Sequence, residues 1–204
     1  MKAFIFTAFL YLSLFACCNQ ASKHTNPGSL EKKIEEKFFL DLGGSKQYVE
    51  ITAASDAKPV LLFIHGGPGW PQTPHLRYFN ADLTKAFILA TWDQRGCGKS
   101  FMNDSAAENL SLDQIVADAH QLTQFLKTKY GKRKIYLAGF SWGSIVGLTL
   151  AQKYPEDYFA YAGIAQVINI PKGMKVTQNW LKEQATRQHD TATLQTLAKL
   201  ISKD

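Results

Sequence analysis

Cysteine is scarce in this 204-residue chain, which contains only Cys17, Cys18 and Cys97. Two of the three are neighbours near the N-terminus, so the sequence excludes a disulfide-stapled domain. Cys97 lies between glycines and is expected to pack as a small apolar residue. None of the five histidines has zinc-site spacing to a cysteine, and neither a metal site nor a cofactor is predicted.

Runs of like charge are also lacking. The formal net charge of +6 comes from lysines and arginines spread along the chain, with a modest cluster at 127–134. We interpret them as solvated surface and predict no nucleic-acid partner, because no basic stripe interleaved with aromatic residues accompanies them. With 46% hydrophobic and 20% charged residues, the composition is typical of one globular domain.

The N-terminal hydrophobic run, residues 3–16, is too short to span a bilayer as a mature helix. It follows Lys2 and ends at "LFAC", which resembles a bacterial lipobox, so we predict a signal peptide over 1–17 and a lipid on Cys17. Cys18 is the adjacent alternative, and simple signal cleavage or a short membrane anchor also remain open. Residues 18–34 are predicted to form a polar tether.

This N-terminus predicts an exported bacterial lipoprotein that is anchored in a membrane. Without the lipid, the protein would be periplasmic or secreted. The sequence does not indicate an oligomeric state.

Strands and helices alternate from residue 35 onward. Residues 37–42 and 46–51, joined by two glycines, predict a hairpin. Continuous apolar runs at 59–65, 86–92 and 134–140 predict buried parallel strands, and 158–170 predicts one more.

Two helices are predicted between these strands. An apolar stripe from Leu112 to Leu126 indicates an amphipathic helix with Ser111 as N-cap, ending near Gly131. A second helix is expected over 144–154. The alternation predicts an α/β fold with a mostly parallel sheet covered on both faces, and a ligand site beyond the carboxyl ends of the strands.

Three unusual loops follow the carboxyl ends of the predicted parallel strands. They are "GGPGWPQ" after 59–65, "DQRGCGKS" after 86–92, and the turn at Ser141 after 134–140. The spacing Gly139-x-Ser141-x-Gly143 fits a nucleophile elbow, a strand-to-helix turn so tight that the flanking positions admit no side chain. The alternative is that Ser141 is only a turn residue.

Bare backbone amides near Ser141 are candidates for an oxyanion hole. We predict that the N–H groups of Gly67 and Trp142 donate to the substrate oxygen, each worth about 3 kcal/mol in the transition state. His65 precedes the serine and is expected to shape the loop through a hydrogen bond, while Asp93 and Arg95 are expected to hold the second loop together. The other predicted structural residues around the site are Gly66, Pro68, Gly69, Gly139 and Gly143.

"HGGPG" at 65–69, "DQRGCGKS" at 93–100 and "GFSWGS" at 139–144 occur in this order. The ordered set resembles the prolyl aminopeptidase (proline iminopeptidase) type of α/β-hydrolase, peptidase family S33, over about residues 35–170. The resemblance implies that Ser141 attacks the carbonyl of an N-terminal residue, often proline, and forms an acyl-enzyme that water hydrolyses. The family also contains esterases and amidases, so the implied substrate is a small peptide, amide or ester.

The sequence offers Ser141 no convincing base. His189 is the only histidine after Ser141 and lies in a polar segment, whereas the resemblance implies a strand-end Asp followed by a His. We therefore expect an α/β-hydrolase core (35–170) truncated before its last strands, followed by the start of a helical cap (171–204). This chain is expected to be inactive alone. Two alternatives are a non-catalytic lipoprotein that binds a peptide or acyl ligand, and a fragment that does not fold.

Overall fold

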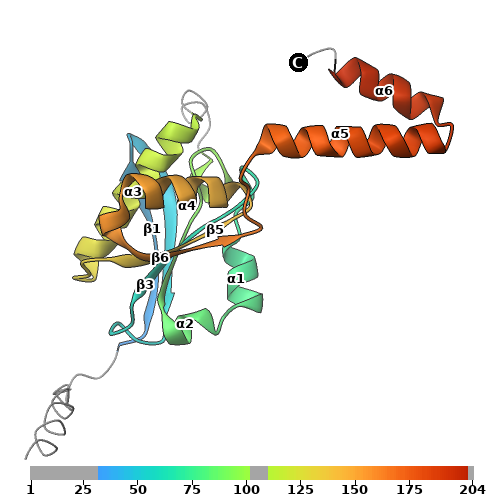
Figure 1. Cartoon of the computed structure of the whole chain (residues 1–204). Coiled ribbons are helices and arrows are strands. Elements are labelled where there is room, and N and C mark those ends of the chain that lie inside the picture. Colours follow the sequence, from blue (N-terminus) through green and yellow to red (C-terminus); the bar gives the residue numbers. More distant parts are fainter. Residues whose placement is uncertain (1–31, 102–109, 202–204) are drawn as a thin grey trace, which may run out of the picture. The chain divides into compact units, whose positions relative to one another are not determined.

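The computed structural model describes residues 32–101 and 110–201 (Figure 1). The predicted signal peptide, the lipid on Cys17 and most of the tether lie outside these residues. Within the described ranges, no helix has both the length and the hydrophobicity needed to cross a membrane.

The predicted hairpin is confirmed. β1 (Ile34–Leu42) pairs antiparallel with β2 (Ser45–Ala53), with Leu42 opposite Ser45. Gly43 and Gly44 form the turn at φ of +56° and +75°, a region that glycine enters without steric cost. β1 begins one residue inside the segment predicted as tether.

The remaining strands form the parallel part of one six-stranded sheet. They are β3 (Val60–Ile64), β4 (Ile88–Trp92), β5 (Ile135–Phe140) and β6 (Tyr158–Ile164). The strand order is β1-β2-β4-β3-β5-β6, and β2 pairs antiparallel with β4. Every residue of β3 and β4 is buried, as their continuous apolar runs predict.

Helices cover both faces of the sheet, as expected. α3 (Leu112–Lys129) and α4 (Trp142–Lys153) pack on one face, and the short α1 (Thr73–Phe79) and α2 (Leu83–Ala86) pack on the other (Figure 1). The Ser111 hydroxyl caps α3 by accepting from the backbone N–H of Gln114 at 3.2 Å. The described residues also form 3-10 turns at η1 (Gly98–Ser100) and η3 (Pro155–Asp157).

The strand predicted over 158–170 is too long. β6 ends at Ile164, Ala165 turns the chain at φ of +49°, and α5 (Ile170–Arg187) begins five residues later. The Asn169 side chain caps α5 by accepting from the backbone N–H of Lys172, and Pro171 lies in its first turn. α6 (Thr191–Ile201) follows, so the segment after residue 170 is helical as predicted.

Candidate active site

Ser141 lies in the tight turn between β5 and α4, at φ of +50° and ψ of −117°. Residues with a side chain rarely adopt this conformation, and it occurs mostly where function requires it. A Cβ atom on Gly139 would collide with the carbonyl of Gly143, and one on Gly143 would collide with the carbonyl of Ile64. The turn therefore has the steric demand of a nucleophile elbow.

The backbone of this turn is fixed on both sides of Ser141. Its N–H donates to the carbonyl of Ile164 at 2.9 Å, and its carbonyl accepts from the N–H and the hydroxyl of Ser144. The Ser144 hydroxyl in turn accepts from the N–H of Val167 at 2.9 Å. Within the described residues the Ser141 hydroxyl itself forms no hydrogen bond, so it is available to a substrate.

The first glycine-rich loop lies against the serine. A methyl group on Gly66 would stand 3.1 Å from Cβ of Ser141 and 2.9 Å from the carbonyl of Phe140. Gly67 adopts φ of +115° and precedes Pro68 through a cis peptide bond, and Gly69 lies beside Cys97. The three loops therefore converge as predicted.

The N–H groups of Gly67 and Trp142 have no acceptor among the described residues. That leaves both free for a substrate oxygen, while their catalytic role stays a prediction.

His65 supports the first loop through a hydrogen bond to Gly66. The residue is 2% exposed; its Nδ1 donates to the carbonyl of Gly66 at 2.9 Å, and its Nε2 accepts from the N–H of Gln94 at 3.1 Å. Burial lowers the pKa of His65, which favours the neutral ring that this bonding pattern requires. Because both ring nitrogens are engaged, His65 is not placed to take a proton from Ser141.

Cys97, in contact with His65 Nε2 at 3.4 Å, is buried. Burial raises the pKa of its thiol to about 12, so it packs as a neutral side chain.

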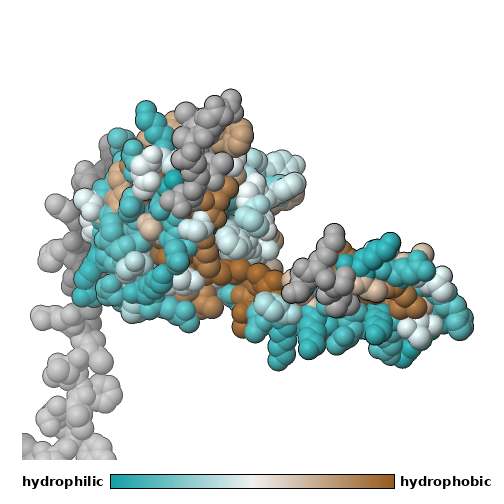
Figure 2. Space-filling model, turned by 90° about the horizontal axis from the view of Figure 1, so that it is seen from above, coloured by the Kyte–Doolittle hydropathy of each residue, from teal (hydrophilic) through white to brown (hydrophobic). Residues whose placement is uncertain are grey.

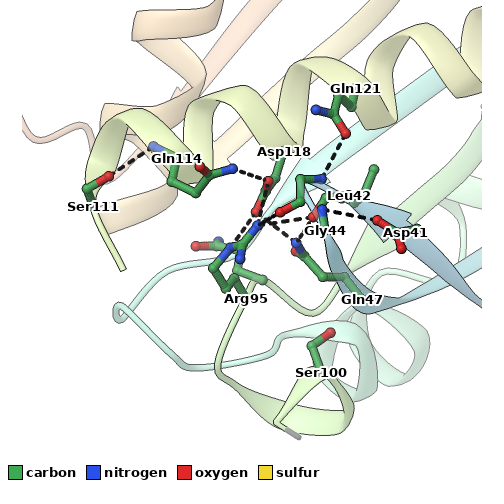
Figure 3. A network of polar contacts seen from close by, with 12 residues as sticks. Asp41, Leu42, Gly44, Gln47, Arg95, Ser100, Ser111, Gln114, Asp118 and Gln121 are labelled. Atoms are coloured by element: carbon green, nitrogen blue, oxygen red, sulfur yellow. Dashed lines mark hydrogen bonds and ion pairs between the residues drawn. The ribbon is translucent and has the colours of Figure 1, made fainter. Parts of the chain in front are cut away.

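Asp93 and Arg95 hold the second loop through hydrogen bonds and an ion pair. The Asp93 carboxylate accepts from the N–H of Lys99 at 2.9 Å, and burial raises the pKa of Asp93. Arg95 forms a two-pronged ion pair with Asp118 of α3, at 2.9 and 3.0 Å (Figure 3). Its guanidinium also donates to the carbonyls of Leu42 and Gly43, which ties the loop to the end of the hairpin.

Asp118 holds Arg95 in place, and the sequence analysis did not single it out. It is completely buried and accepts from Arg95, from Gln47 at 2.7 Å and from Gln114 at 2.8 Å. A signal was present, because Asp118 stands on the buried side of α3, between Ile115 and Leu122. An acid within an apolar stripe indicates a buried partner of opposite charge.

Asp157 and His189, which follow Ser141 in the sequence, form no hydrogen bond with it. Asp157 accepts from Lys127, from Gln124 at 2.7 Å and from His120 at 3.0 Å. Burial opposes its ionisation, but the hydrogen bonds from Lys127 and His120 hold the pKa of Asp157 below its usual value. His189 is exposed in the turn between α5 and α6.

In residues 32–101 and 110–201, no carboxylate or imidazole hydrogen-bonds to Ser141. The same residues contain no group of three side chains suited to hold a metal ion.

Comparison with known proteins supports the assignment of these motifs. The family model described as serine aminopeptidase, S33, matches residues 36–204. The chain is 39% identical over 139 residues to the probable aminopeptidase YbaC of Bacillus subtilis (strain 168), and 39% identical over 110 residues to the proline iminopeptidase of Neisseria gonorrhoeae. These matches cover 68% and 53% of this chain.

A crystal structure of the proline iminopeptidase-related protein from Thermus thermophilus aligns with a TM-score of 0.57 and 25% identity, over 68% of this chain and 47% of that one. The chain spans 44% of the Bacillus protein and 33% of the Neisseria enzyme. Ordered motifs, sheet topology and the family match agree with one another. The chain belongs to the S33 serine aminopeptidase family of α/β-hydrolases.

Proposed function

We propose that this chain carries the nucleophile and the oxyanion hole of a prolyl aminopeptidase-like serine hydrolase. The observation that carries the proposal is the Ser141 turn, with φ of +50° and a hydroxyl that has no partner among the described residues, beside Gly66 of the first loop. A strained serine turn that meets unengaged backbone amides is the arrangement that acyl transfer needs.

The proposed reaction proceeds through an acyl-enzyme. Oγ of Ser141 attacks the carbonyl carbon of the N-terminal residue of a small peptide, and the N–H groups of Gly67 and Trp142 receive the oxyanion. The peptide amine leaves with a proton, and water then hydrolyses the ester on Ser141. The names of the relatives support a peptide substrate with a free N-terminus, and proline is the proposed first residue.

Ser141 needs a base that the described residues do not provide. We therefore propose activity for a protein in which residues other than these bring an imidazole and its carboxylate partner to Ser141. The chain of 204 residues is proposed to be inactive by itself.

A fluorophosphonate probe tests this proposal, because it labels only an activated serine. We expect the complete protein encoded by the gene to be labelled, and Ser141→Ala to abolish labelling. Ser45→Ala, which removes a hydroxyl at the start of β2, is the control and should leave Ser141 as the labelled residue. A folded, unlabelled protein would contradict the proposal.

The second candidate is a lipoprotein that binds a peptide or acyl ligand without turnover, which the unpartnered Ser141 hydroxyl also permits. Ligand binding detected by calorimetry, without labelling at Ser141, would favour it.

Anchoring through a lipid on Cys17 is a separate proposal, supported by the "LFAC" sequence. Metabolic labelling with palmitate should be lost in Cys17→Ser and retained in Cys18→Ser.

A further inference from the structure

Gln94 joins two of the three loops at the candidate site. The residue is 2% exposed, and its side-chain Nε2 donates to the carbonyl of His65 at 2.9 Å. At the other end of the same amide, Oε1 accepts from the indole N–H of Trp142 at 3.2 Å. Its backbone N–H adds the bond to Nε2 of His65.

These two partners belong to the segments that present the candidate oxyanion donors. The carbonyl of His65 lies two residues before Gly67, and Trp142 directly follows Ser141. Within the described chain, no other side chain hydrogen-bonds to both segments. The side-chain amide of Gln94 therefore joins the first loop to Trp142, the residue after the nucleophile.

The chemistry of this bridge is directional. A carbonyl on one side requires a donor and an indole N–H on the other requires an acceptor, so the side chain must offer one of each. A neutral carboxamide does this, and a carboxylate does not, because it has acceptors only. A buried donor or acceptor without a partner costs about 1–3 kcal/mol, which favours the bridged arrangement.

We propose that Gln94 is a positioning residue that sets the spacing between the N–H groups of Gly67 and Trp142. The inference rests on the proposed function and assigns a role that goes beyond it. Oxyanion stabilisation depends on donors held at a fixed distance from the developing charge, and a misplacement of about 1 Å can cost about 100-fold in rate. Gln94 would act through the two loops and does not itself touch the substrate.

The test uses the rate of fluorophosphonate labelling of Ser141, measured against pH in the complete protein as its gene encodes it. Gln94→Met keeps the approximate size of the side chain and removes both hydrogen bonds, and we expect labelling to slow by about 10- to 100-fold at every pH. Gln94→Glu is expected to be slow when ionised, since a carboxylate oxygen then faces the carbonyl of His65. Once protonated, its O–H donates to that carbonyl, so its rate relative to the unsubstituted protein should rise as pH falls.

Thr123 of α3 provides a matched control. It is completely buried, its hydroxyl donates to the carbonyl of Ala119 at 2.9 Å, and it shares a second hydrogen bond with the hydroxyl of Tyr158 at 3.0 Å. Thr123→Val removes both bonds away from the three loops, so we expect it to lower the melting temperature without a pH-independent loss of labelling. Any difference from Gln94→Met then reports on position and not on lost stability.

Two results would overturn the inference alone: labelling of both Gln94 variants at the unsubstituted rate, or an equal loss in Gln94→Met and Thr123→Val with no recovery of Gln94→Glu at low pH. Failure of the unsubstituted protein to label at Ser141 would overturn the proposed function and this inference with it. The two failures are therefore distinguishable.

Discussion

Ser141 shows how a single residue can be specified by its neighbours. Its left-handed backbone is costly for a side chain, by about 1–3 kcal/mol, and persists because the turn leaves no alternative path. Gly139 and Gly143 let the strand and the helix approach so closely that neither position admits a Cβ atom. The pattern Gly-x-Ser-x-Gly is thus a packing requirement as well as a motif.

Gly143→Ala tests this requirement. The added methyl would collide with the carbonyl of Ile64, which belongs to a strand that cannot move aside, so we expect the free energy of unfolding to fall by about 1–3 kcal/mol. Urea denaturation followed by circular dichroism measures the change. Gly173→Ala in α5 is the control, because its methyl meets nothing within 4 Å, and its stability should stay equal or rise. Equal loss in both variants would refute the steric account.

At the scale of elements, local patterns predicted the buried strands well. Short continuous apolar runs are typical of strands that are buried on both faces, and β3 and β4 lie where those runs occur. The predicted end of β6 was wrong because Ile168 and Ile170 continue the apolar pattern of the strand, although both residues are exposed. α1 and α2 were missed because they are short, and neither has a side-chain cap.

The residues of the candidate site were also predictable only where their pattern is local. Ser141 and its glycines were found because their spacing is local. The contacts of Gln94 with His65 and Trp142, and of Arg95 with Asp118, join residues 23 to 48 positions apart, which no short pattern records. Such pairs depend on how the elements pack, and only the structure reveals them.

The Arg95–Asp118 pair links α3, the second loop and the hairpin end, so its loss should affect all three elements. Arg95→Met leaves the completely buried carboxylate of Asp118 without its cation, and we expect a loss of about 3–5 kcal/mol in unfolding free energy. The double variant Arg95→Met/Asp118→Leu should lose less than the sum of the single variants. Urea unfolding of all four proteins completes the cycle.

A control for this cycle comes from an exposed ion pair. Lys85 and Asp82 are 74% and 87% exposed, so Lys85→Met should leave the unfolding free energy unchanged within error. If the Arg95 and Asp118 losses are additive, the pair does not act as a coupled link between the elements.

At the scale of the whole molecule, the described sheet ends in a strand with an open edge. β6 pairs only with β5, and of its residues only Tyr158 is buried. Hydrophobic residues gather on the surface where the core leads into α5 (Figure 2). Ile164, Ile168 and Ile170 of this stretch are exposed, and Phe159 is exposed near the other end of β6. An unpaired edge flanked by apolar side chains favours pairing with another chain.

We therefore expect the 204-residue chain to self-associate through β6 at micromolar concentration. Phe159→Lys replaces a side chain that is 57% exposed with a charge that opposes edge pairing, and it should shift the chain toward the monomer in sedimentation velocity experiments. Tyr78→Lys removes an 81% exposed aromatic from α1, away from this edge, and should leave the association unchanged. A monomer at all concentrations, or an equal shift in both variants, would show that β6 does not mediate association.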